Sequence, residues 1–260
     1  MNTPIVESRR TILACIALAG AVAIALLSLA SVARGGDAKA QGVKTDALYP
    51  HSVKLTDGKT AHWAVLMRRT VVRAKPGLAS RVIATLPTGT TDGTQNDVLV
   101  LSRIDLSPTS SWYWVRLPIL PNNTTGFVRK RDLSPLFTVH THLFINRGAL
   151  TATLERYGKV VFKTRVGVGK SYWPTPRGEF YVRDKLTNFN NPFYGPLAFG
   201  ISARSAVLTD WPGGGYVGIH GTNEPQLIPG YISHGCIRMR NASILALSRL
   251  MPVGTPVSIR

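Results

Sequence analysis

Hydrophobic and polar residues alternate over short distances through most of this 260-residue chain, as they do in β-strands. Between about residues 62 and 134, short apolar or alternating runs are separated by turn-forming residues. The runs are AVLM, TVVRAKPG, RVIATLPTGT, DVLVLSRI, WYWVRLP and TGFVRKRDL. A spacing of about 8 to 12 residues between short strands is typical of a small barrel or sandwich. The pattern predicts a β-domain at 61–135, preceded by a polar linker at 35–60.

Residues 136–260 show the same strand-like pattern and one helix. The runs FTVHTHLFI, TATLERYG, KVVFKTRVGVG, GEFYVRD, VGIHGT and GTPVSIR are the predicted strands. Asn241 has the chemistry of a helix N-cap and Pro252 would end the helix. The apolar positions between them form one stripe: Ile244, Leu247, Leu250 and Met251. The fold class predicted for the whole chain is therefore mainly β, with few helices.

The first 34 residues differ from the rest because they contain a continuous apolar run. Residues 11–33 carry no charge and follow Arg9 and Arg10. Roughly 20 apolar residues are enough to span a bilayer, and the basic pair would keep the N-terminus inside. A signal peptide cleaved after Ala33 is the alternative, but its apolar core is usually about 7 to 15 residues long. Residues 1–34 are thus predicted to be a signal anchor or a signal peptide, and the rest of the chain to be exported.

The net charge of +18, from 31 Lys and Arg against 13 Asp and Glu, favours polyanionic surroundings. The longest basic run is only RKR at residues 129–131, and no recognition-helix pattern is visible, which argues against nucleic acid as a partner. An exported protein meets anionic envelope polymers and acidic lipids first. These are the predicted polyanionic partners.

Cys236 is the only cysteine outside the apolar segment, which contains Cys15. The exported part has no second thiol for a disulfide, so Cys236 is a candidate reactive thiol. His220 ends an apolar run, and a loop rich in proline and glycine leads from it to Cys236. An imidazole beside a thiol accepts its proton and lowers its pKa. This pair is the predicted nucleophile and base.

The residues around Cys236 leave several interpretations open. Gly235 would let the backbone approach a substrate, and the amides of Gly235 and Cys236 would bind an oxyanion. Arg238 would either hold a carboxylate or anchor the turn. A zinc site of His220, His234 and Cys236 is the competing interpretation, but no acidic residue is placed to orient such ligands. We therefore predict no metal and no cofactor.

Three further motifs are interpreted as structural. TRVGVGKS ends like a phosphate-binding loop, but it lacks the first glycine and continues into YWPTP, where no helix is expected. His140 and His142 alternate onto one strand face without nearby Cys, Asp or Glu at ligand spacing. The sequence NNTT at 122–125 contains glycosylation sequons, but it precedes a strand and is interpreted as turn chemistry.

VGIHGT followed by SHGCIRMRN resembles the signature of the L,D-transpeptidase (YkuD) family. GVGKSYWPTPRGEFYV and GTPVSI resemble further segments of that family. The resemblance implies a curved β-sandwich over 136–260, with Cys236 as nucleophile and His220 as general base and acid. It implies that His234 and Arg238 shape the site and contact substrate, and that Ser233 supports the turn. A backbone carbonyl, expected at Gly221, would orient the base. Residues 61–135 resemble a bacterial SH3-like domain, which implies wall attachment or packing against the next domain.

The activity implied by the resemblance is peptidoglycan L,D-transpeptidation in the bacterial cell envelope. Cys236 would form an acyl-enzyme with a stem tetrapeptide and transfer it to the amine of an acceptor stem. With water as acceptor, the same site would act as an L,D-carboxypeptidase or a cross-link hydrolase. A wall-binding protein without catalytic activity is the alternative from another class, against which the intact pair of Cys236 and His220 argues.

Overall fold

The computed structural model describes residues 49–90, 93–187, 191–208 and 215–260. Asp46–Arg260 form one compact unit. The apolar segment at 11–33, predicted to be an anchor or signal, lies outside the described residues, as does most of the predicted linker. Within the described ranges, no helix is long and apolar enough to cross a membrane.

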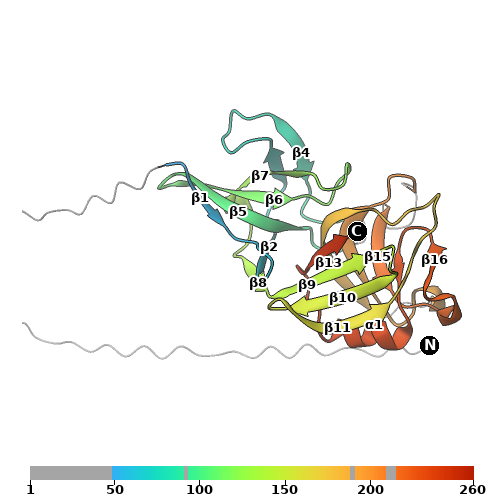
Figure 1. Ribbon diagram of the computed structural model, residues 1–260. Helices are drawn as coiled ribbons and strands as arrows, with labels where there is room; N and C mark the ends of the chain where they lie inside the picture. The colour runs from blue at the N-terminus through green and yellow to red at the C-terminus, as the bar shows by residue number, and fades with distance from the viewer. Residues whose placement is uncertain (1–48, 91–92, 188–190, 209–214) are drawn as a thin grey trace, which may run out of the picture. The chain divides into compact units, whose positions relative to one another are not determined.

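The first part of the described chain forms an eight-stranded sheet in the order β4-β3-β7-β6-β5-β2-β8, with β1 paired to β5 (Figure 1). Its strands are β1 (His51–Lys54), β2 (Ala61–Val65), β3 (Thr70–Arg73), β4 (Val82–Leu86), β5 (Asp97–Ser107), β6 (Ser110–Arg116), β7 (Thr125–Arg129) and β8 (Phe137–Val139). A short 3₁₀ helix, η1 (Lys130–Asp132), follows β7. Buried apolar side chains from each of β2 to β7 form one core cluster of this sheet.

Two strands of this sheet lie outside the predicted limits of 61–135. β1 falls within the predicted polar linker, yet it pairs antiparallel with β5, so that His51 lies opposite Asp105. β8 falls within the range predicted for the second domain, yet it pairs with β2, with Val139 opposite Ala61. β1 is only four residues long and shows no strand pattern in the sequence, whereas β8 was predicted as part of the strand run FTVHTHLFI but pairs with the first sheet.

In the aromatic run of β6, strict alternation predicts that Trp112 and Trp114 share one face, and aromatic residues in such a strand are more often barrel core than a ligand platform. The structure buries Trp112, whereas Trp114 is 37% exposed and stacks on Phe127. Tyr113 and Val115 supply the side chains of β6 that enter the core cluster. The prediction is therefore wrong for Trp114. Both register shifts between β5 and β6 add a residue to β5, so β6 keeps its alternation and its core face is the one that carries Tyr113 and Val115.

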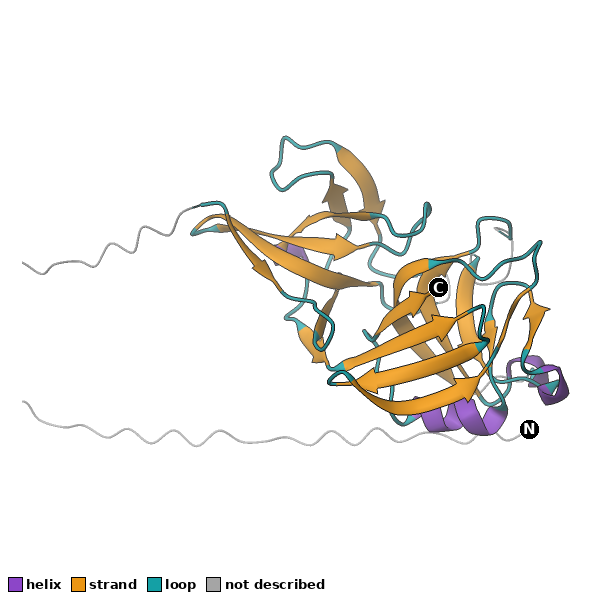
Figure 2. Ribbon diagram, in the orientation of Figure 1, coloured by secondary structure: helices purple, strands orange, loops and turns teal. Residues whose placement is uncertain are grey.

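The second part forms a ten-stranded sheet in the order β11-β10-β9-β18-β13-β14-β15-β17-β12-β16. Its strands are β9 (Thr141–Asn146), β10 (Thr151–Arg156), β11 (Lys159–Arg165), β12 (Gly167–Gly169), β13 (Gly178–Thr187), β14 (Leu197–Arg204), β15 (Tyr216–His220), β16 (Gly230–Ser233), β17 (Ile237–Arg238) and β18 (Pro256–Ile259). Two 3₁₀ helices, η2 (Pro192–Tyr194) and η3 (Pro225–Leu227), and one α-helix, α1 (Asn241–Ser248), complete it (Figure 2). The prediction of a mainly β protein with few helices is confirmed.

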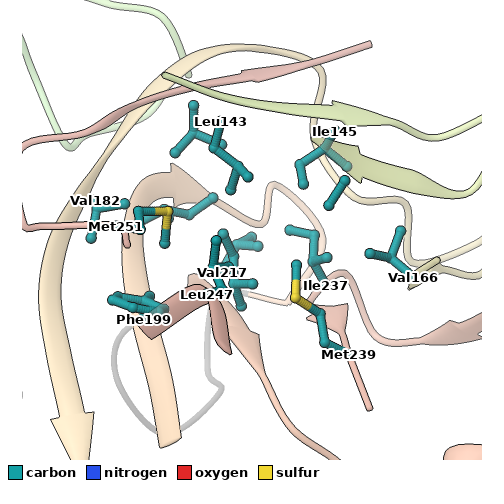
Figure 3. Packing of buried hydrophobic residues seen from close by; sticks show 14 of the residues in the cluster. Leu143, Ile145, Val166, Val182, Phe199, Val217, Ile237, Met239, Leu247 and Met251 are labelled. Atoms are coloured by element: carbon teal, nitrogen blue, oxygen red, sulfur yellow. The ribbon is translucent and has the colours of Figure 1, made fainter. Parts of the chain in front are cut away.

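β13 connects the two halves of this sheet. Gly178–Tyr181 pair with β18, and Val182–Thr187 pair with β14. The apolar face encloses a single core in which residues of α1 pack against β14, β15 and β17; Figure 3 labels Phe199, Val217, Ile237 and Leu247 there. This core supports β15 and β17, the strands that carry the residues of the candidate site.

The helix begins one residue earlier than predicted, because Asn241 was expected at the N-cap position. Asn241 is the first residue of α1, and Arg240 occupies the N-cap position. The Asn241 side chain is engaged elsewhere, because its Oδ1 accepts a hydrogen bond of 2.9 Å from the Thr222 amide. Ile244, Leu247 and Met251 are buried, which agrees with the predicted stripe.

The motifs interpreted as structural have structural partners. TRVGVGKS spans the end of β11 and the short strand β12, and no helix follows it. His142 Nε2 lies 2.8 Å from Ser258 Oγ, and His140 Nδ1 lies 3.3 Å from Thr60 Oγ1. Thr124 closes its turn on the carbonyl of Pro121.

Candidate active site

Parallel pairing of β15 with β17 brings His220 and Cys236 into one pocket. Ile219 lies opposite Ile237 and His220 opposite Arg238, so Cys236, directly before β17, lies near Gly218. The Gly218 amide donates a 3.4 Å hydrogen bond to Cys236 Sγ. A Cβ atom at Gly218 would lie 3.7 Å from His220 Cδ2 and 3.8 Å from Cys236 Sγ. The imidazole of His220 and the thiol of Cys236 therefore both border the position of Gly218.

A backbone carbonyl holds the imidazole of His220. Nδ1 lies 2.6 Å from the Gly221 carbonyl oxygen, which only accepts, so Nδ1 carries the proton. Burial lowers the pKa of His220 to about 4; the Gly221 hydrogen bond opposes this shift and the charge of Arg238 reinforces it. Near neutral pH the ring is uncharged, and Nε2 is the nitrogen that is available to accept a proton.

The thiol of Cys236 is half-buried and opens onto the pocket. Burial raises its pKa, although the Gly218 amide and the charge of Arg238 act in the opposite direction. The sequence led us to expect an imidazole that lowers the thiol pKa, and that expectation is wrong for this state. Because both pKa shifts favour uncharged groups, the resting pair is a thiol and a neutral imidazole.

The nucleophile turn (residues 233–238) is held by hydroxyl groups. Ser233 Oγ donates to the Cys236 carbonyl at 2.6 Å and accepts from the Gly235 amide at 3.1 Å. Gly235 has a φ of +116°, in a region that side-chain-bearing residues rarely adopt. The predicted role of the Gly235 amide in binding an oxyanion therefore needs correction, since this amide already bonds Ser233. Within the described residues, the Cys236 amide has no hydrogen-bond acceptor.

Thr175 braces the same turn from a distant segment. It is fully buried, and its hydroxyl donates to the Gly235 carbonyl and accepts from the Gly169 amide, both at 2.8 Å. A Cβ atom at Gly169 would lie 2.2 Å from the Trp173 carbonyl, so this close approach requires glycine. Sequence reasoning matched the segment containing Thr175 but did not single out this residue.

Arg238 is buried and paired within its own chain. Its Nη1 donates to Glu224 Oε2 at 3.0 Å, and its guanidinium lies 4.2 Å from the centre of the Phe193 ring. Arg238 was predicted either to hold a carboxylate or to anchor the turn. These contacts favour the second role, because they tie the turn to the loop that carries Glu224. Arg238 also lines the pocket, next to Cys236.

The pocket has an aromatic wall (Phe193, Tyr194 and Tyr216) that sequence reasoning did not assign. Phe193 and Tyr194 come from η2, whose first turn is capped by Asn191 Oδ1, which accepts from the Phe193 amide at 3.0 Å. The Tyr194 ring meets the His220 ring edge to face, at 5.1 Å between centroids. In the sequence, the adjacent Phe193 and Tyr194 after Asn191-Pro192 were the one sign of this wall. Their approach to His220 depends on tertiary structure.

His234 lies at another edge of the pocket. The centre of its ring lies 4.0 Å from the centre of the Trp173 ring. Burial lowers the pKa of His234, and the positive charges of Lys170 and Arg238 lower it further. The structure thus brings every sequence-predicted site residue into or beside one pocket. Among the described residues, no group of three or more His, Cys, Asp and Glu side chains is arranged to hold a metal ion. The chemistry that this arrangement supports is nucleophilic acyl transfer by a thiol.

Comparison with known proteins matches the second part of the chain. The YkuD family, described as the L,D-transpeptidase catalytic domain, matches residues 140–259. A Bacillus subtilis protein named as the L,D-transpeptidase YkuD is 35% identical over 123 residues, which cover 47% of this chain and 68% of that protein. Its Bacillus licheniformis counterpart is 34% identical over 122 residues, covering 47% and 67%. The solved catalytic domain of an Enterococcus faecium L,D-transpeptidase is 25% identical, with a TM-score of 0.36, covering 46% of this chain and 96% of that domain.

Proposed function

Because this chain belongs to the L,D-transpeptidase (YkuD) family, whose members act on peptidoglycan, we propose that it cross-links stem peptides through an acyl-enzyme on Cys236. The observation that carries the proposal is the carbonyl-oriented imidazole of His220 beside the thiol. Its Nδ1 is fixed by the Gly221 carbonyl at 2.6 Å, and Cys236 Sγ and His220 Cδ2 border the same glycine. No acidic residue is required to orient the base.

The first half-reaction transfers the stem peptide to sulfur. His220 Nε2 takes the Cys236 proton as sulfur attacks the carbonyl carbon of the third stem residue. Because the resting pair is uncharged, proton transfer accompanies attack. The C–N bond to the terminal D-alanine then breaks, and the imidazolium returns its proton to the departing amine. The products are a thioester on Cys236 and free D-alanine.

The second half-reaction releases the peptide to an acceptor. The side-chain amine of the diamino acid on another stem attacks the thioester carbonyl, and His220 takes the proton that this amine loses. The C–S bond breaks, and sulfur regains a proton from the imidazolium. A new amide joins the third residues of the two stems, and the enzyme is restored. Splitting one amide exchange into two steps is the advantage of a covalent nucleophile.

The Cys236 amide is the proposed donor to the developing oxyanion. It is the amide of the nucleophile itself and has no acceptor among the described residues, whereas the Gly235 amide bonds Ser233 Oγ. An oriented backbone donor in a water-poor site stabilises the tetrahedral intermediate. Fixing Gly235 through Ser233 and Thr175 keeps this amide in place.

We further propose a setting for this reaction. Residues 61–135 act as an SH3-like accessory domain, and residues 1–34 direct the chain to the bacterial cell envelope. The charge of +18 favours association with anionic envelope polymers there. The stem peptides of peptidoglycan are the donor and acceptor substrates.

Muropeptide analysis tests the proposed function. The purified full chain, in detergent, is incubated with sacculi rich in tetrapeptide stems, and the digested products are separated by mass. We expect new dimers linked between third residues, with release of D-alanine. Tripeptides without dimers would instead assign water as the acceptor, as in an L,D-carboxypeptidase. Unchanged muropeptides together with retention on sacculi would indicate a wall-binding protein without activity.

A further inference from the structure

Asn122 lies in a turn of the first sheet and contacts the end of β14, directly before the pocket residue Ser205. It follows β6 in the turn that leads to β7. Its Nδ2 donates to the Arg204 carbonyl at 2.7 Å, and its Oδ1 accepts from the Arg204 amide at 2.9 Å. Arg204 ends β14 and pairs with Tyr216 of β15. The Asn122 side chain thus occupies both backbone groups of one residue, as a neighbouring strand would.

The contact of Asn122 with Arg204 lies beyond the stretch over which β13 and β14 pair. β13 pairs with β14 only from Val182, opposite Ile201, to Thr187, opposite Leu197. Arg204 lies three residues past Ile201, and its backbone amide and carbonyl both bond the Asn122 side chain. Backbone polar groups that are partly buried need partners, and Asn122 supplies both.

Tyr216 connects this contact to the pocket. Its ring lies between two guanidinium groups, 4.1 Å from that of Arg183 and 4.7 Å from that of Arg204. Its hydroxyl donates to the carbonyl of Pro118, also in the first sheet's turn, at 3.0 Å. Tyr216 lines the pocket together with Ser205, the residue after Arg204. The turn between β6 and β7 therefore contacts both β14, through Arg204, and β15, through Tyr216.

We propose that Asn122 is a positioning residue for the reaction, through which the first sheet sets the part of the pocket wall formed by Ser205 and Tyr216. The expected effect on catalysis rests on the proposed function, whereas the contact between Asn122 and Arg204 is independent of it. Because Asn122 acts on the wall and not on the thiol or imidazole, its loss should change the use of the stem peptide more than the reactivity of Cys236.

Asn123 provides a matched control. Its Oδ1 accepts from the Glu179 amide at 2.7 Å, so it also joins the first sheet to the second, but through β13 and away from the pocket. Asn123 has a φ of +68°, so Asn123→Gly removes the contact without adding backbone strain. Asn122→Ala and Asn123→Gly each remove a contact between the sheets, and only the first contact leads to the pocket.

The first measurement is hydrogen–deuterium exchange in the full chain, which needs no activity. We expect Asn122→Ala to speed exchange about tenfold in peptides that cover 198–206 and 215–220, and Asn123→Gly to leave them unchanged. Equal exchange in Asn122→Ala and the wild type would overturn the proposal, as would equal acceleration by both variants.

The second measurement compares kinetics. We expect Asn122→Ala to lower kcat/KM for the tetrapeptide donor about tenfold, mainly through KM, while alkylation of Cys236 by iodoacetamide keeps its wild-type rate. Asn123→Gly should retain kcat/KM. A wild type without transfer would refute the proposed function, and exchange would still decide the role of Asn122. An active wild type matched by Asn122→Ala would refute only the positioning role.

Discussion

The nucleophile turn and the aromatic wall border the same pocket but are built differently. The turn is held mainly by residues within it, since Ser233 bonds the backbone at Gly235 and Cys236. The wall joins η2, which carries Phe193 and Tyr194, to Tyr216 of β15, which is held in turn from the first sheet. Under the proposed function, the difference separates two tasks: a short segment fixes the attacking sulfur, and distant segments shape the space for the peptide.

This separation predicts different losses on the two sides of the pocket. A change in the turn should impair the chemical step with any substrate. A change in the wall should impair the stem peptide more than a small reagent, because only the peptide needs the wall. Four substitutions or conditions test this expectation, from the largest effect to the smallest.

Replacing the nucleophile should have the largest effect. Cys236→Ala removes the atom that forms the thioester, so dimer formation should fall by at least ~10³-fold. Mass spectrometry of the intact chain should show no acyl adduct in this variant. Cys15→Ala, the other thiol of the chain, serves as the control and should keep full activity. Substantial transfer by Cys236→Ala would contradict the covalent mechanism.

Lowering the pH should destabilise the turn through His220. Its folded-state pKa of about 4 lies below the ordinary value of 6.5, so the unfolded chain binds the proton first. The stabilisation is complete above about pH 6.5 and is lost as the pH falls towards 4, by about 3 kcal/mol. Denaturant unfolding at a series of pH values measures this loss.

His220→Asn is the control for that titration, because it cannot be protonated in this range. The difference in unfolding free energy between the wild type and this variant should shrink as the pH falls from 6.5 to 4. A difference that does not depend on pH would show that His220 is not buried as a neutral ring.

Removing the brace of the turn should have an intermediate effect. Thr175→Val keeps the shape but loses both hydrogen bonds, leaving the Gly235 carbonyl and the Gly169 amide without a partner. We expect a loss of about 1 to 3 kcal/mol in unfolding free energy. Alkylation of Cys236 should also change, because the turn shifts. Thr175→Ser restores the hydroxyl and should recover most of the stability; equal losses in both variants would assign the effect to packing.

Changing the wall should have the smallest effect. Phe193→Leu keeps an apolar contact but removes the ring beneath the Arg238 guanidinium, worth about 0.5 to 1 kcal/mol. We expect a few-fold rise in KM for the tetrapeptide donor with little change in iodoacetamide alkylation. If alkylation slowed as much as peptide transfer, the wall would not be separable from the chemistry.

The sequence contained most of the chemistry because that chemistry is local. SHGCIRM places the thiol, Ser233 and Arg238 within six residues, and a turn so short has few ways to fold around a glycine with a positive φ. The mainly β class also followed from the pattern, because alternation over short runs reports directly which side of a strand is buried. The predicted carbonyl partner of His220 at Gly221 lies in the adjacent residue.

Tertiary structure alone decided the rest. It placed Thr175 behind Gly235 and Phe193 under Arg238, and it engaged Asn241 with Thr222 instead of the helix end. It also raised the thiol pKa that a neighbouring imidazole was expected to lower, because desolvation depends on everything packed around a group and not on its neighbours in sequence. The contact between Asn122 and Arg204 likewise has no sequence signal, because 82 residues separate them and only the folded chain brings the turn before β7 to the end of β14.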